Sequence, residues 1–157
     1  MKIYINQANF LIDEFDKYKS KLYVHMRKEN YEMSHILSFI NGYMLIVELC
    51  SRYVLDIVMA KGYTPISNFK TVLFDSYEDV SEKLLNRAAD DASKVVNKCD
   101  EWEKIGIKYA LCFAKFYIKD IVFGDDIYVE DSLYMDIPNE YALEWYDWEE
   151  RGYDFNI

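Results

Sequence analysis

Apolar residues recur at three- and four-residue steps over most of the first 60 positions, which is the period of an amphipathic α-helix. The first run predicts a helix over about residues 7–28, with Asn6 as a candidate cap. The second run extends from about Met33 to a stop signal at Lys61-Gly62 and leaves only a narrow polar stripe. Because it is apolar around most of its circumference, we expect this helix at the centre of a bundle.

The same period predicts two more helices, over about 76–99 and 101–122, the first capped by Asp75 or Ser76. Gly106 and the charged residues before it indicate a break or kink, so one helix or two stays open for this stretch. Short extended pieces are predicted around 3–5 and 71–74, where β-prone residues occur.

Residues 124–157 carry weaker signals. Ile127–Val129 is β-prone. Asp136, with Pro138 in the first turn, is expected to start a final helix that runs to about Arg151, just before Gly152. The expected fold is therefore an all-α bundle of four to five helices with an acidic, aromatic-rich C-terminal appendage. With 157 residues and no repeat of fixed period, the chain is expected to form a single domain over 1–157.

Composition adds that the chain can fill a buried core, since 52% of its residues are hydrophobic and only two are proline. The longest apolar run, 36–60, contains Glu48, Arg52 and Asp56. Each of these charges would cost about 2.5–3.5 kcal/mol at the centre of a bilayer. No secretory signal is expected at the first residues. We therefore expect a cytoplasmic protein that does not contact membranes.

The three cysteines, Cys50, Cys99 and Cys112, form an odd set without a close pair. Each lies in an apolar helical pattern, so we expect three buried free thiols in a reducing compartment. A reactive cysteine would need an exposed, electropositive setting, and the neighbouring sequence supplies none.

The charge of the chain is distributed unevenly. Residues 1–123, here called the body, contain 17 acidic and 17 basic side chains. Residues 124–157, here called the acidic segment, contain eleven acids and one base, Arg151, and so carry the whole net charge of −10. The acidic segment also contains eight Tyr, Trp and Phe residues. This partition indicates a segment that binds a positively charged surface.

The predicted final helix combines the aromatic and the acidic character. Three residues of each kind share the spacing i, i+4, i+7 and form two stripes about 100° apart: Tyr141, Trp145 and Trp148, and Glu140, Glu144 and Asp147. Tyr and Trp are enriched at binding hot spots, and carboxylates pair with Lys and Arg of a partner. Two interpretations stay open: the rings dock on the bundle, or they remain accessible beside the acids.

Clustered carboxylates do not suit direct binding to nucleic acid or to an anionic membrane, since both carry phosphate charge. They suit a basic protein that itself binds phosphates, because opposite charge raises the encounter rate at low salt. The residues expected to make or steer this contact all lie in the acidic segment: Glu140, Glu144, Trp145, Asp147, Trp148, Glu149, Asp125, Asp126, Glu130 and Asp131.

The leading hypothesis is a non-enzymatic inhibitory protein of the immunity type, bacterial or phage, which neutralises a basic toxin or nuclease domain by occlusion. The first alternative is a phage-encoded DNA mimic that inhibits restriction or CRISPR machinery, because spaced carboxylates can imitate DNA phosphates. A homodimer through tyrosine-rich faces also stays open.

Catalytic patterns are sparse. Glu32 and His35 have the Glu-x-x-His spacing of di-iron carboxylate bundles, but such a site needs a second motif and two more glutamates. A metal-dependent helical-bundle enzyme is therefore the second alternative. No glycine-rich phosphate loop or Ser/His/Asp signature occurs, and we expect neither a metal nor another cofactor.

Overall fold

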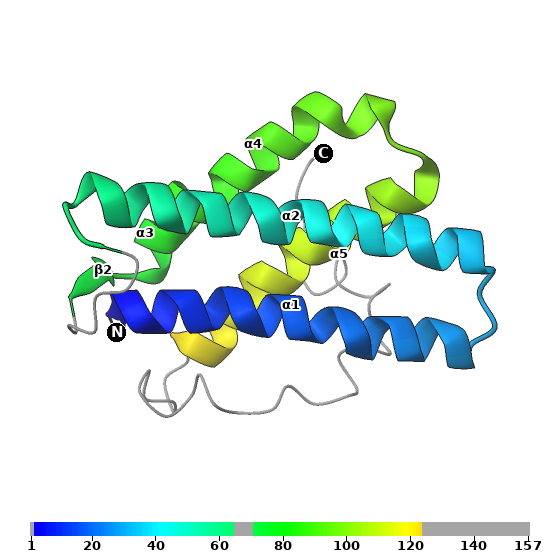
Figure 1. The fold of residues 1–157 in the computed structure, drawn as a ribbon, viewed down its shortest axis with the longest axis horizontal. Coiled ribbons are helices and arrows are strands. Elements are labelled where there is room, and N and C mark those ends of the chain that lie inside the picture. Colours follow the sequence, from blue (N-terminus) through cyan, green and yellow to red (C-terminus); the bar gives the residue numbers. More distant parts are fainter. Residues whose placement is uncertain (1, 65–70, 124–157) are drawn as a thin grey trace.

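The computed structural model describes residues 2–64 and 71–123. Its elements follow in the order β1 (Ile3–Tyr4), α1 (Ile5–Lys28), α2 (Met33–Ala60), β2 (Val72–Phe74), α3 (Tyr77–Val80), η1 (Ser81–Leu85), α4 (Asn86–Val95), η2 (Val96–Lys98), α5 (Glu101–Phe116) and η3 (Tyr117–Val122). The elements η1 and η3 are π-helical, and η2 is a 3₁₀ turn. Because α3 to η2 follow without interruption and η3 continues α5, these ranges contain four helical stretches and one small sheet (Figure 1). The prediction of a mainly helical bundle is confirmed.

The central position predicted for the second helix is confirmed. Helix α2 packs against α1, α4, η1 and α5, and its buried residues recur along most of its length (Figure 1). It ends where the sequence predicts, at Lys61-Gly62. Gly62 has φ 78°, a left-handed conformation that glycine adopts without a Cβ penalty.

Helix α1 begins at Ile5, earlier than predicted, and its cap is Tyr4 rather than Asn6. The reason is the strand β1 directly before it, which pairs antiparallel with β2. The chain turns from strand to helix at Tyr4, whose backbone N–H donates a hydrogen bond of 3.2 Å to Oε1 of Gln7. Both predicted extended pieces therefore form, and together they close one end of the bundle.

Helices α2 and α5 approach so closely that their backbones touch. A Cβ on Gly42 would overlap the backbone carbonyl of Glu103, and a Cβ on Gly106 would overlap that of Phe39. The predicted break or kink at Gly106 is therefore wrong, because α5 runs through this position. Glycine stands there since only the absence of a side chain allows the contact.

The interruption between the last two helical stretches lies at Cys99 and Asp100, where the backbone is extended. Asp100 caps α5, accepting a hydrogen bond of 2.8 Å from the backbone N–H of Glu103. The preceding stretch begins at the predicted cap, Ser76, which accepts from the N–H of Asp79 at 3.1 Å. Two separate stretches over about 76–99 and 101–122 are thus confirmed, with Val122 as the last residue of the second.

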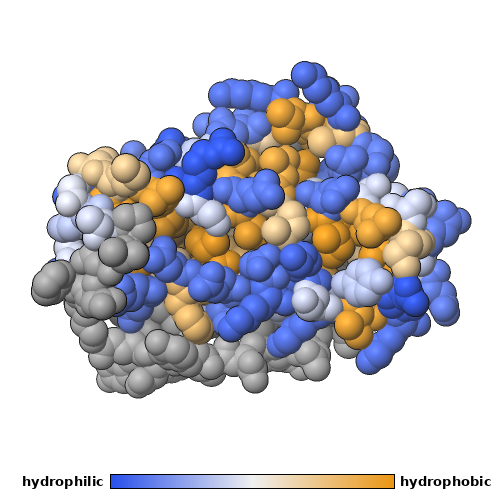
Figure 2. All heavy atoms as spheres, viewed as in Figure 1, coloured by the Kyte–Doolittle hydropathy of each residue, from blue (hydrophilic) through white to orange (hydrophobic). Residues whose placement is uncertain are grey.

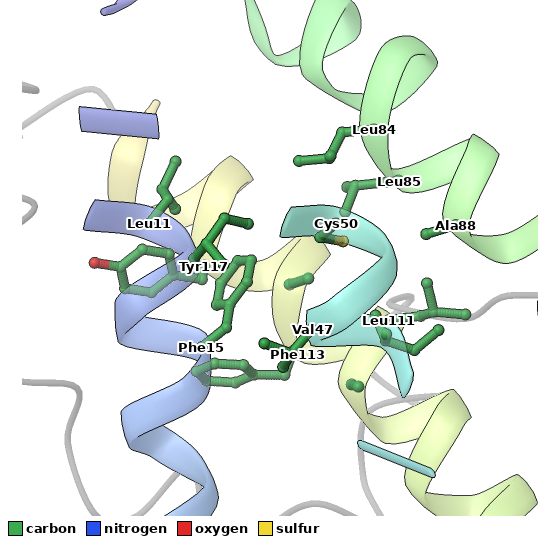
Figure 3. Packing of buried hydrophobic residues seen from close by; sticks show 14 of the residues in the cluster. Leu11, Phe15, Val47, Cys50, Leu84, Leu85, Ala88, Leu111, Phe113 and Tyr117 are labelled. Atoms are coloured by element: carbon green, nitrogen blue, oxygen red, sulfur yellow. The ribbon is translucent and has the colours of Figure 1, made fainter. Parts of the chain in front are cut away.

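The core contains a cluster of aromatic rings between α1, α5 and η3. The ring of Phe15 meets Phe113 and Tyr117 edge-on, with centroids 6.0 and 5.6 Å apart (Figure 3). The ring of Tyr18 stacks on Phe113 with centroids 4.1 Å apart. Such pairs contribute about 0.5–1.5 kcal/mol each beyond the burial of their area. This cluster fixes η3, the last described element, against the middle of α1.

The π-helical turn η1 belongs to the second part of the core. Leu84 and Leu85 are both buried there, beside Cys50 of α2 (Figure 3). The wider turn is closed by a bond from the N–H of Asn86 to the carbonyl of Ser81. Across the described ranges, no helix combines the length and the apolar character needed to cross a membrane.

Candidate functional site

The ten residues that the sequence assigns to partner binding lie in 124–157, outside the described residues: Asp125, Asp126, Glu130, Asp131, Glu140, Glu144, Trp145, Asp147, Trp148 and Glu149. The predicted final helix and the β-prone stretch 127–129 lie there as well. These assignments stay predictions. The structure describes the body to which the acidic segment is attached.

The body holds the start of the acidic segment at a defined place. The backbone N–H of Phe123 donates to the carbonyl of Ile118 at 3.0 Å, which closes the last turn of η3. Tyr117, at the start of η3, is fully buried against Phe15 of α1. From this contact η3 continues to Val122, and Figure 1 shows its end beneath the N-terminal part of α1.

Charge is unevenly placed within the balanced body too. From residue 17 to residue 28, α1 carries five cationic side chains and no carboxylate: Lys17, Lys19, Lys21, Arg27 and Lys28. The antiparallel helix α2 packs beside this half of α1, and its residues 33–47 include no Asp, Glu, Lys or Arg. The end of the α1–α2 hairpin is thus the part of the body best suited to negative charge.

An apolar hollow lies on the same half of the hairpin. It has a volume of about 250 Å³ and is lined by Lys19, Ser20, Tyr23, Val24 and Ile40. We call these residues, together with Leu37 one turn before Ile40, the hairpin groove. On the face that carries α1 and α2 in front, Figure 2 shows hydrophobic side chains interspersed with hydrophilic ones.

The groove combines exposed apolar atoms with a cationic rim. Val24 is 49% exposed and Leu37 is 54% exposed, so both present apolar atoms to solvent. Lys19 contacts Asp16 of its own helix at 3.3 Å. The guanidinium of Arg27 lies 6.0 Å from the ring centroid of Tyr23. This mixture is typical of a binding surface rather than of a catalytic pocket.

A second hollow on the hairpin is smaller and more polar. It measures about 190 Å³ and is lined by Asn9, Ile12, Asp13, Ser51 and Val54. The Ser51 hydroxyl donates a hydrogen bond of 2.9 Å to the carbonyl of Val47, one helical turn earlier. No histidine is among the described residues that line this hollow, and Asp13 supplies the carboxylate there.

The Glu-x-x-His pair lies at the surface, not in the bundle interior where a di-iron site would need it. Nε2 of His35 is 3.6 Å from Oε2 of Glu32, and their side chains are 40% and 75% exposed. The His35 ring stacks on Trp102 with centroids 4.9 Å apart, and Tyr31 meets Trp102 edge-on. Within 2–64 and 71–123, no group of three or more His, Cys, Asp and Glu side chains could hold a metal ion.

The thiols are poor nucleophiles in this setting. Burial raises the pKa of Cys50 to about 12. Partial desolvation, followed by the nearby Glu103, raises the pKa of Cys99. A protonated thiol is neither a strong nucleophile nor a metal ligand.

All three cysteines are free, as predicted. Burial is confirmed for Cys50 and Cys112, but the expectation is wrong for Cys99, which is only partly buried. Cys99 stands at the extended break between η2 and α5, so fewer neighbours cover it.

Two tyrosine hydroxyls are buried for packing rather than for chemistry. The hydroxyl of Tyr43 donates to the backbone carbonyl of Phe15 at 2.6 Å, and burial holds the pKa of Tyr43 well above its ordinary value. Burial, followed by the charge of Glu14, also raises the pKa of Tyr117. Both groups are neutral at physiological pH, so neither can act as a phenolate.

The fold therefore defines an all-α helical bundle with a surface groove on one hairpin. Comparison with protein-family models, with curated proteins and with solved structures finds no match for this chain. Function is accordingly inferred from the charge and the surfaces of the chain itself.

The hairpin groove is not among the site residues predicted from the sequence. Two signals in the sequence point to it: the cationic stretch 17–28 without a carboxylate, and the uncharged stretch 33–47 that follows the hairpin turn. Neither is informative alone, since the first resembles a solvated helix and the second a core helix. Only their antiparallel pairing creates an apolar hollow with a basic rim.

Proposed function

We propose that this protein is an acidic inhibitory protein of the immunity type, which neutralises a basic toxin or nuclease domain by covering its functional surface. The observation that carries the proposal is the charge partition. The acidic segment holds the entire net charge of −10, while the body balances 17 acids with 17 bases. Solubility alone would be served by charge spread over the whole surface.

The described body fits the role of a scaffold. Its buried tyrosines are neutral and its Glu-x-x-His pair faces solvent, so catalysis at these groups has little support. The aromatic cluster around Phe15 anchors η3, the element that leads into the acidic segment. A firmly anchored attachment reduces the entropy lost when the segment binds a partner. A cytoplasmic location is part of the proposal and fits the three free thiols.

Two kinds of residue would make the proposed contact with the partner. Trp145 and Trp148 would supply desolvated anchors, because aromatic hot spots cost about 2 kcal/mol or more when truncated. Glu140, Glu144 and Asp147 would pair with Lys and Arg of the partner and speed the encounter. The remaining predicted residues, Glu149, Asp125, Asp126, Glu130 and Asp131, would add to the negative field.

The test is a charge reversal with a matched control. The full chain and the triple variant Glu140→Lys, Glu144→Lys, Asp147→Lys serve as baits in host lysate, and a basic protein retained only by the wild type is purified. Its dissociation constant, salt dependence and nuclease or toxin activity are then measured with each bait. We expect the reversal to weaken binding by about 100-fold or more and to reduce the salt dependence.

The control replaces three exposed acids of the body, Glu29→Lys, Glu82→Lys and Asp90→Lys, and so changes the net charge by the same amount. It should bind nearly as the wild type does. If both triple variants weaken binding equally, the effect comes from net charge and not from the three acids of the predicted helix. An unchanged dissociation constant in the variant Glu140→Lys, Glu144→Lys, Asp147→Lys would refute the proposal.

A DNA mimic is the second candidate, and the density of charge favours it: eleven acids against one base within residues 124–157. A mimic must occupy the nucleic-acid groove of its target, so duplex DNA should compete with it directly. An immunity protein can bind beside that groove. Competition between duplex DNA and this protein for the captured partner therefore separates the two functions.

A further inference from the structure

The hairpin groove presents apolar atoms that no described part of the chain covers. Val24 and Leu37 are about half exposed at the same level of the hairpin, since α1 ends at Lys28 and α2 begins at Met33. The hollow of about 250 Å³ is lined by Val24 and by Ile40, one turn after Leu37 on α2. Such a surface in a soluble protein is typically a contact site.

The charge around the groove selects a negative occupant. Residues 17–47 contain five Lys and Arg against only Glu29 and Glu32, and two of the five, Lys17 and Lys19, contact Glu14 and Asp16 just before this range. The acidic segment has the opposite charge and is rich in aromatic residues. Groove and segment are therefore complementary in both charge and apolar character.

The segment is also attached close enough to reach the groove. The described chain ends at Phe123, six residues after Tyr117, so the distance to the groove has to be covered by the residues that follow. The linking stretch 124–138 can span up to about 50 Å when extended, whereas the whole of α1 is about 36 Å long. A covalent link of this length gives an effective concentration of about the millimolar range.

We propose that the hairpin groove binds residues 139–151 of the same chain. The predicted aromatic stripe meets Val24, Leu37 and Ile40, and carboxylates beside it pair with Lys19 and Arg27. One part of this proposal rests on the proposed function, namely that a basic partner would compete with the groove for these carboxylates. The free protein would then keep its binding segment covered until such a partner displaces it.

Hydrogen exchange of the full chain, followed by mass spectrometry, tests the docking without any partner. In the wild type, the amides of residues 141–150 should be protected. The variant Leu37→Asp places a charge in the groove, and exchange of 141–150 should become at least about tenfold faster. Leu55→Asp is the control, because Leu55 is similarly exposed, at 42%, on the same helix but outside the groove.

A second pair of variants addresses the rim. Lys19→Glu with Arg27→Glu should also release 141–150, whereas Lys2→Glu with Lys98→Glu, an equal change of charge at exposed positions outside the rim, should not. Unchanged exchange of 141–150 in both groove variants would overturn the proposal, as would equal acceleration in the controls. Light scattering that shows a dimer, with protection lost on dilution, would assign the groove to a second copy and overturn it too.

The two proposals can fail separately. If docking holds and no basic partner exists, the exchange results stand while the lysate capture finds nothing. If both hold, Lys19→Glu with Arg27→Glu should bind the captured partner several-fold more tightly, because the internal competitor is removed.

Discussion

The body and the acidic segment of this chain use their residues in contrasting ways. The body places apolar residues at helical spacing, buries them around α2 and α5, and balances its charges. The acidic segment is rich in carboxylates and aromatic rings and contains a single basic residue, Arg151. The contrast teaches that stability and recognition can be assigned to different parts of one small chain, so changes in the two parts should have separable effects.

The largest effect is expected where the backbones of α2 and α5 touch. Gly42→Ala or Gly106→Ala would push a methyl group into a backbone carbonyl, which cannot move aside as a flexible side chain can. Each should lower the free energy of unfolding by about 3 kcal/mol or more, measured by urea denaturation. Asn41→Ala, at the exposed neighbouring position, should change it by less than about 0.5 kcal/mol. A loss below about 1 kcal/mol for both glycine variants would show that the helices can separate.

A second prediction concerns a residue that should affect partner binding much more than the stability of the fold. Trp148→Ala should weaken binding to the captured basic partner by about 30-fold, the equivalent of a hot spot of about 2 kcal/mol. The urea midpoint should fall only by the small contribution that Trp148 makes to docking in the hairpin groove. Calorimetric titration and urea denaturation of the same variant provide both numbers. A large loss of stability with unchanged affinity would place Trp148 in the core and invert the assignment of roles.

A third prediction sharpens the description of the body. The guanidinium of Arg87 in α4 lies 4.0 Å from the ring centroid of Tyr53 in α2, and that ring is nearly buried. Arg87→Ala should cost about 1 kcal/mol of stability through the lost cation–π contact and packing. Arg52→Ala removes the same group from an exposed position and serves as the comparison. Equal effects would show that the contact contributes nothing specific.

The smallest expected effect is a change in how the free energy of unfolding depends on pH under acidic conditions. The backbone N–H of Glu103, followed by the hydroxyl of Ser38 at 2.8 Å, lowers the pKa of Asp100 below its ordinary value. The unfolded chain therefore takes up this proton first, and the contribution of Asp100 is present above about pH 4 and lost as pH falls below it. Asp100→Asn should show a slightly shallower loss of stability between about pH 5 and pH 2.5. An identical slope would mean that the cap does not depend on charge.

The sequence predicts much of the body because its signals are local. The end of α2 follows from Gly62, and the start of the third helical stretch follows from Ser76, since each cap acts within one turn. Gly106 is different. A glycine inside a helical pattern can mark a kink or a close approach, and only the carbonyl of Phe39 on another helix decides between them.

The candidate surfaces divide in the same way. The uneven distribution of charge is found by counting acidic and basic residues, so the acidic segment is evident from the sequence. The hairpin groove needs two stretches, around Val24 and Leu37, to be brought together by the fold. Likewise, the spacing of Glu32 and His35 says nothing about which face of the bundle they occupy, and the structure places them at the surface.

The helix crossing at Gly42 and Gly106 has an evolutionary consequence. Any larger residue at one position intrudes on the main chain opposite the other, so neither can change freely while the fold persists. Surface carboxylates face no such restriction, so their positions in the sequence can change as the surface of a binding partner changes. Distant homologues of this chain should retain a pair of glycines at these two positions even where the charges of their surfaces differ completely.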